Sequence, residues 1–456
     1  MELTPRTALL CATLVCGLIP GRSLVAQDAT AKPFTPFVEL GFEERVRTER
    51  WNNTDFNSGN TISSTSSDPR TQYRFRSRLW AVADLTPDLE IAAGLCHEAR
   101  KVKRVDDYSY NGREVLFDTL YVDYKFTPQL TARVGRQNIV RGEGFILMDG
   151  TAGDGSRTTY FNAVDVAYAW SKSKLEFIGI TNFSDDRLPV LNEKDTPINR
   201  LNEWNEQAVG LYYTGKEWSG TTLDAYYILK SETHDYRATT SASFQPDRQF
   251  STLGARAAQE LGQGWSITGE FAYQWGSQDA NPLAVDVRNL DERDISAWGG
   301  YARVKKSFEA AWKPSISAGY VALSGQDGSN KITAWNPVFS RFPKWSEYYV
   351  YAIAPEKGVA YWQNLGMWEL EVKCSPCKAV DLRATYYCMK AFEASTGTDK
   401  DRGDLYELRA DMRFSPAFKG HVVYERMIPG NYKAANDPGY FFRAEVSYTF
   451  KHRFWL

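Results

Sequence analysis

The sequence of 456 residues predicts an all-β fold: a transmembrane antiparallel β-barrel of about 18 strands, with short periplasmic turns and long extracellular loops. Three observations carry this prediction. Segments of about ten residues alternate apolar and polar side chains between turn residues. The connections alternate between short and long. Beyond the N-terminus there is no apolar run of roughly 18 residues, the length that a membrane-spanning helix needs.

The N-terminus differs from the rest of the chain. An arginine near the start precedes an apolar run from Ala8 to Ile19, a Pro-Gly break and then the small residue Ala26. This order is typical of a secretory signal peptide. We expect residues 1–26 to be a signal peptide cleaved after Ala26, residues 27–36 to be a periplasmic linker and residues 37–456 to form the barrel.

Residues 72–85, QYRFRSRLWAVADL, show the alternation most clearly. Tyr73, Phe75 and Leu79 share one face. Three arginines share the other: Arg74, Arg76 and Arg78. An arginine that faces lipid at mid-bilayer costs about 2 to 4 kcal/mol, so three of them would approach the whole stability of a typical domain. The arginine face therefore points into the lumen.

The same phasing applies near the C-terminus. Alternation along the strands places Leu382, Leu408 and Val446 on the outward face. One arginine on each of these strands then faces inward: Arg383, Arg409 and Arg443. Carboxylates share this inward face, among them Glu39, Asp123, Glu270, Glu407 and Glu445. Two interpretations stay open with equal weight. The arginines select anions, or they pair with carboxylates of neighbouring strands inside a wet lumen.

Tight links are expected at residues 86–88, 127–129, 171–174, 215–219, 262–264, 306–314, 374–377 and 415–418, with long polar loops between them. This spacing gives about 18 strands with both termini on the periplasmic side. The sequence does not decide whether loop 138–161 or loop 324–360 folds into the pore.

The segments LTARVGRQNIVRGEGF and DGSRTTYFNAVDVAY, within residues 130–168, resemble the alginate-export family of outer-membrane barrels. The resemblance implies an 18-stranded monomeric barrel that passes an anionic polysaccharide through a lumen of arginines and carboxylates. It points to Arg133, Arg136 and Arg157. Arg136 falls on the lipid side of the strand phasing unless Gly135 forms a β-bulge.

The predicted function is an outer-membrane channel for passive export or diffusion of an anionic, alginate-like polysaccharide. The alternative is a substrate-specific porin for sugars or small organic anions. The expected partners are an anionic polysaccharide or oligosaccharide, outer-membrane lipid and periplasmic export proteins. The residues expected to line the pore and bind substrate are Arg74, Arg76, Arg78, Arg133, Arg136, Arg157, Arg383, Arg409 and Arg443.

Other classes of function are disfavoured by the residues present. A net charge of -2 gives no field that would attract nucleic acid. None of the four histidines stands beside a serine or a paired carboxylate, so we expect no enzyme. The CSPC motif at 374–377 lacks the further ligands of a zinc site, and we expect a turn or a local disulfide there, with no metal and no cofactor.

Overall fold

The computed structural model describes residues 34–53, 69–103, 108–111, 115–148, 160–183, 189–191, 205–233, 246–281, 287–340, 345–348, 363–394, 399–432 and 437–456. The chain divides into two units, Met1–Thr35 and Pro36–Leu456, and every strand belongs to the second unit. The expected signal peptide, residues 1–26, lies outside the described residues. No helix among the described residues is long and apolar enough to cross a membrane.

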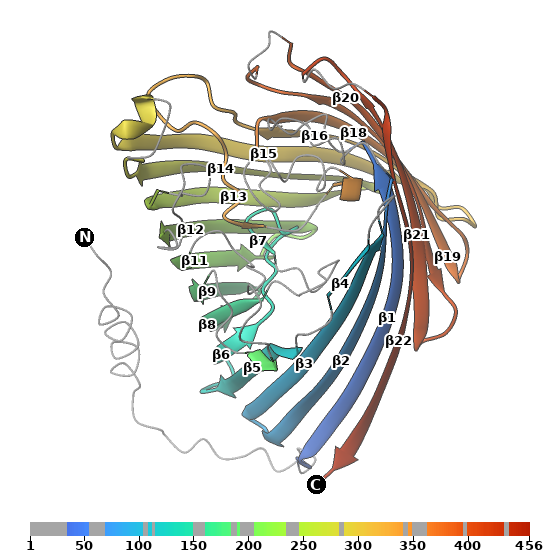
Figure 1. Cartoon of the computed structure of the whole chain (residues 1–456). Coiled ribbons are helices and arrows are strands. Elements are labelled where there is room, and N and C mark those ends of the chain that lie inside the picture. Colours follow the sequence, from blue (N-terminus) through green and yellow to red (C-terminus); the bar gives the residue numbers. More distant parts are fainter. Residues whose placement is uncertain are drawn as a thin grey trace. The chain divides into compact units, whose positions relative to one another are not determined.

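Eighteen long strands form one antiparallel sheet within the described residues. In chain order they are β1 (Phe37–Asn52), β2 (Arg70–Thr86), β3 (Leu89–Lys103), β5 (Val115–Lys125), β6 (Leu130–Gln137), β8 (Phe161–Trp170), β9 (Ser173–Asn182), β11 (Asn205–Gly215), β12 (Thr221–Thr233), β13 (Arg248–Gly262), β14 (Trp265–Gln278), β15 (Arg293–Ser307), β16 (Ser315–Leu323), β18 (Leu365–Cys377), β19 (Val380–Lys390), β20 (Asp401–Arg413), β21 (Phe418–Pro429) and β22 (Gly439–Trp455). Each pairs with the next, as Figure 1 shows.

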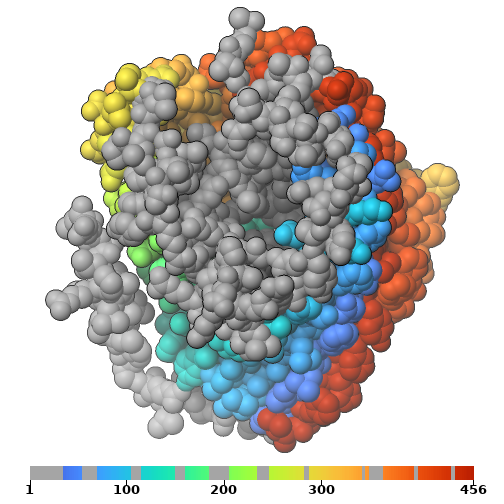
Figure 2. Space-filling model, in the orientation of Figure 1, coloured from blue at the N-terminus to red at the C-terminus, as the bar shows by residue number. Residues whose placement is uncertain are grey.

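The sheet closes because the last strand returns to the first. Strand β22 pairs antiparallel with β1 along its whole length, from Phe37 opposite Trp455 to Asn52 opposite Tyr440. In Figure 2 the red C-terminal strands lie directly beside the blue N-terminal strands. Closure leaves no unpaired edge among the long strands, which is the condition that a sheet must meet in lipid.

Short elements complete the fold. Strand β4 (Tyr108–Asn111) pairs with β3, and β10 (Pro189–Leu191) pairs with β5. A 3-10 turn, η2 (Val287–Leu290), follows β14. Strands β7 (Leu147–Met148) and β17 (Phe339–Ser340) form a separate two-stranded sheet, and this sheet shapes the lumen.

The alternation read from the sequence is present in the strands. On β2, Tyr73, Phe75 and Leu79 are 41%, 43% and 56% exposed, whereas Arg74 and Arg76 are each 5% exposed. Large apolar side chains on one parity therefore cover the outer face, and arginines lie on the lumen side. Exposed aromatic residues also mark the ends of the strands beside the short turns, among them Trp170, Trp218, Trp265, Trp312 and Trp455. Such girdles sit at membrane interfaces.

The CSPC motif is placed differently from the expectation. Strand β18 runs through all four residues, and the turn falls on Lys378 and Ala379. A register shift between Cys374 and Cys377 absorbs the irregularity. Both thiols are free. Cysteines three positions apart on an extended strand are held about 10 Å apart, too far for a bridge, so this part of the structure does not favour a local disulfide.

Candidate functional site

Two loop segments fold into the barrel and fill part of its lumen. We call them together the inner layer: residues 139–148, and residues 335–340 with 345–348. Their large apolar side chains are almost completely buried, including Phe145, Leu147, Trp335, Phe339 and Tyr348. The parallel pairing of β7 with β17 joins the two segments. The described segments of both loops that the sequence left undecided, 138–161 and 324–360, therefore enter the pore.

The inner layer packs on the apolar inward side chains of the strands. The rings of Phe145 and Trp335 are stacked with their centroids 5.3 Å apart, and Phe145 meets Tyr301 of β15 edge to face at 5.5 Å. Gly299 makes room for the Trp335 ring, because a Cβ at this position would lie 2.7 Å from it. The segments fold inward because their aromatic residues find apolar surface inside the barrel.

Ion pairs hold the first segment, residues 139–148, to the barrel wall through one cationic and one anionic side chain of the segment. An Nη2 group of Arg141 lies 2.5 Å from Asp165 of β8 and 2.8 Å from Glu176 of β9. Glu143 lies 3.5 Å from Arg303 of β15 and 3.9 Å from Arg256 of β13. The segment thus spans the stretch of wall from β8 to β15 and occupies lumen space in front of it.

The second segment has its own buried anchors. The ammonium of Lys230, on β12, donates to the carbonyl of Val338 at 2.5 Å and lies 2.6 Å from Glu206 and 2.6 Å from Glu232. The side-chain amide of Gln274, on β14, makes two hydrogen bonds with the backbone of Asn336, at 2.8 and 3.0 Å. These contacts fix the backbone of the segment against the strands.

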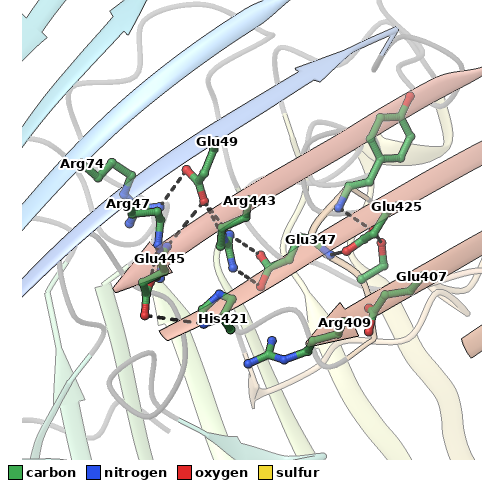
Figure 3. A network of polar contacts seen from close by, with 12 residues as sticks. Arg47, Glu49, Arg74, Glu347, Glu407, Arg409, His421, Glu425, Arg443 and Glu445 are labelled. Carbon is green, nitrogen blue, oxygen red and sulfur yellow. Dashed lines mark hydrogen bonds and ion pairs between the residues drawn. The ribbon is translucent and has the colours of Figure 1, made fainter. Parts of the chain in front are cut away.

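Two carboxylates hold the end of the second segment, as Figure 3 shows. Arg443 donates to both oxygens of Glu347, at 2.7 and 2.9 Å. Glu425, on β21, accepts hydrogen bonds from the hydroxyl of Ser346 and from the backbone N–H groups of Glu347, at 2.9 Å, and Tyr348, at 3.1 Å. A charged pair and a carboxylate clamp therefore act on consecutive residues.

Strands β22, β1, β2 and β3 carry a buried ladder of alternating charge. Its arginines are Arg45, Arg47, Arg74, Arg76 and Arg443, and its carboxylates are Glu43, Glu49, Glu98 and Glu445. The side chains of the arginines are at most 6% exposed. Of the predicted site residues, Arg74, Arg76 and Arg443 therefore serve first to pair with neighbouring strands.

A second group of inward arginines keeps part of its surface in solvent. The exposed fractions of these side chains are 17% for Arg78, 37% for Arg133, 28% for Arg303, 31% for Arg383 and 25% for Arg409. Each is paired with a carboxylate through some of its nitrogens: Asp118, Asp123, Glu369, Glu407 and Asp411 respectively. Arg133, Arg303, Arg383 and Arg409 lie toward the short-turn ends of their strands, and Arg78 lies at the middle of β2. Each of these arginines therefore keeps surface that a passing solute can contact.

The side chain of Arg136 points neither to the lipid nor into the open lumen, the two positions that the sequence left open. Its side chain is only 3% exposed, so it does not face lipid. It donates to the carbonyl of Phe117 at 2.6 Å, and its guanidinium lies 3.7 Å from the centroid of Tyr160. Gly135 has a φ of 128°, yet β6 pairs with both neighbours without a register shift. Arg136 is part of the wall, and Arg157 lies outside the described residues.

Sequence reasoning missed four residues that shape the lumen: Arg141, Glu143, Arg256 and Arg303. For Arg256 a signal was present, because outward Leu253, Ala255 and Ala257 fix its inward phase on β13. For the two loop residues no periodicity exists to read. Within the described residues no group of three or more His, Cys, Asp and Glu side chains could hold a metal ion.

A closed antiparallel barrel with an apolar outer face, a charged lumen and inward-folded loops defines an outer-membrane channel of the porin type. The family comparison agrees and is more specific. The model of the alginate export family matches residues 38–447, so the chain belongs to the alginate export family. Family and fold together place it in the bacterial outer membrane.

Solved structures with the same architecture are distant in sequence. Pseudomonas aeruginosa OccK7 (OpdD) is 9% identical with a TM-score of 0.55, covering 91% of this chain and 99% of that one. Acinetobacter baumannii OccAB1 is 10% identical with a TM-score of 0.54, covering 93% and 99%. Pseudomonas aeruginosa OccK2 (OpdF), solved in complex with glucuronate, is 11% identical with a TM-score of 0.53, covering 91% and 98%. A search of curated protein sequences found no match.

Proposed function

We propose that the protein passes an anionic polysaccharide, or its oligosaccharides, across the outer membrane by diffusion. The observation that carries the proposal is the group of half-buried lumen arginines: Arg78, Arg133, Arg303, Arg383 and Arg409. Guanidinium groups bind carboxylates bidentately and remain charged at any relevant pH, which suits repeated short contacts with a sugar acid. Because a carboxylate already satisfies one side of each arginine, a passing sugar acid is held weakly and released.

The relatives support an acidic sugar as the substrate class. The family is described by alginate export, and one structural relative was solved with a uronate bound. The deeply buried ladder on β22 to β3 contributes rigidity in this proposal. The substrate contacts belong to the arginines that solvent reaches.

A second candidate is a porin for small organic anions or sugars. The inner layer favours it, because two buried segments narrow the lumen that a polymer must pass. Polymer length separates the two candidates, since a small-anion porin passes a monomeric uronate and rejects longer chains. Vesicle swelling with uronate oligomers of increasing length measures this directly.

The decisive test is single-channel conductance of the refolded protein in a planar bilayer. We expect anion-selective current that a polyuronate blocks and a neutral oligosaccharide of the same length does not. Substitution of Arg133, Arg383 or Arg409 by Gln should weaken the block up to about fivefold each, the scale of a partly exposed charge contact. Arg50→Gln is the matched control, because Arg50 lies on the outward face of β1. Cation-selective current insensitive to polyuronate would refute the proposal.

We also infer the processing and state of the mature protein. Residues 1–26 are removed on export, which N-terminal sequencing of the protein purified from outer membranes tests. The barrel acts as a monomer, which light scattering in detergent tests. Recovery of a periplasmic protein with the purified barrel would test for export partners.

A further inference from the structure

The lumen wall near the short turns contains a half-open pocket that none of the contacts described so far explains. Its volume is about 160 Å³, and it is lined by Arg78, Trp80, Ala81, Val82, Ala92, Ala93, Thr119 and Tyr121. These residues come from β2, β3 and β5. The space is enough for on the order of ten water molecules, comparable with the size of one sugar residue.

The pocket exists because its floor is made of small residues around one large ring. Trp80 shares the inward parity of Arg78, and its register partners are Gly41 on β1 and Gly94 on β3. A Cβ at Gly41 would lie 2.0 Å from the Trp80 ring. Because both neighbours lack a side chain, the indole can lie against the wall with Ala92 beside it. The result is an aromatic surface bordered by empty space.

Polar groups of two kinds surround this surface. The Nε of Arg78 donates to Asp118 at 2.5 Å, and its two terminal nitrogens make no hydrogen bond within the described part of the chain. Its guanidinium carbon lies 6.0 Å from the centroid of Trp80. Across the pocket, the hydroxyl of Tyr121 donates to Glu90 at 2.9 Å, and Arg133 lies 4.2 Å from the Tyr121 ring centroid. The hydroxyl of Thr119 completes the lining.

We propose that this pocket is a binding subsite for a single sugar-acid residue of the passing chain. The inference rests on the proposed function and deepens it. The apolar C–H face of the pyranose ring packs on Trp80, and its carboxylate accepts hydrogen bonds from the free nitrogens of Arg78. The Thr119 hydroxyl exchanges hydrogen bonds with the sugar hydroxyls, and the Tyr121 oxygen, whose proton is donated to Glu90, accepts one from them. A bare small anion gains nothing from the indole, and a neutral sugar gains nothing from the guanidinium. The combination therefore selects uronates.

Fluorescence titration of the full barrel in detergent with a tri-uronate tests the subsite. We expect saturable binding with a change in tryptophan emission that Trp80→Leu abolishes, together with an affinity lowered about tenfold. Trp368→Leu is the matched control, because Trp368 is 63% exposed on the outer face. Arg78→Gln should weaken the tri-uronate about tenfold and leave a neutral trisaccharide unchanged.

A filling variant keeps the test decisive if Trp80→Leu does not fold. Thr119→Leu puts a larger, apolar side chain at a partly exposed position of the pocket lining, so it should abolish the emission change while the barrel retains its heat-modifiable mobility on gels. If these variants bind tri-uronate as the wild type does while polyuronate still blocks the current, the subsite is wrong and the channel proposal stands. If the wild-type protein binds no uronate and shows no block, both fail. Citrate binding as tightly as tri-uronate would also overturn the subsite.

Discussion

Lys230 offers the sharpest test of how the inner layer is held. Its side chain is fully buried, its ammonium contacts two fully buried carboxylates and the Val338 carbonyl, and it lies 4.3 Å from the Phe339 ring centroid. Removing one member of a buried ion pair typically costs about 3 to 5 kcal/mol. We expect Lys230→Met to lower the free energy of unfolding by about 3 kcal/mol, the lower end, because Arg248 continues to pair with Glu232.

The measurement is urea unfolding in phospholipid vesicles, followed by tryptophan fluorescence and by electrophoretic mobility. The double variant Lys230→Met with Glu206→Gln should recover at least about 1 kcal/mol, because it removes a buried charge that has lost its shared cation. Lys174→Met is the matched control. Lys174 is 41% exposed and pairs with Glu176 at 2.8 Å, so its loss should cost less than about 1 kcal/mol.

Single-channel records of the same variant report on the lumen. With the Val338 anchor gone, we expect larger fluctuations of the open-channel current than in the control. A loss of stability below about 1 kcal/mol in Lys230→Met, or no recovery in the double variant, would refute the view that this ion cluster is desolvated and holds the segment.

Three further predictions concern the backbone, the lumen charge and the topology. Gly135→Ala should destabilise the barrel by about 2 kcal/mol or more in urea unfolding, because φ is 128° and a Cβ would lie 2.2 Å from the Leu120 carbonyl oxygen. Glu143→Gln should raise anion selectivity, because it removes the negative charge that lies beside Arg256 and Arg303. The measurement is the shift of the reversal potential in a salt gradient. Cys377 is exposed near a short turn, so an impermeant maleimide should label it from the periplasmic side only, whereas buried Cys96 should stay unmodified in the folded barrel.

The barrel could be predicted from sequence because alternation along a strand is local. Arg74, Arg76 and Arg78 had to share a face with one another and oppose Tyr73 and Phe75, whatever the rest of the chain did. The cost of arginine in lipid then chose the face. The structure confirms this phasing: Arg74, Arg76 and Arg78 are much less exposed than Tyr73 and Phe75.

The inner layer could not be predicted in this way. Phe145 and Phe339 belong to loops without periodicity, and each gains its burial from strands distant in sequence. Arg141 and Glu143 looked like loop polar residues until the fold brought them to Asp165 and Arg303. Arg136 shows the limit of the alternation rule itself, because its side chain is buried in the wall at the end of β6, where local contacts override simple alternation.

The parallel pairing of β7 with β17 also bears on how the channel changes state. The backbone of Phe339 donates to the Ile146 carbonyl at 3.0 Å, and the Ser340 hydroxyl donates to the Gly144 carbonyl at 2.6 Å. A displacement of one segment must break these bonds or carry the other segment with it. We therefore expect the two segments to move as one unit: current should step between discrete levels, and a ligand that shifts one segment should also displace the neighbouring segment that is hydrogen-bonded to it.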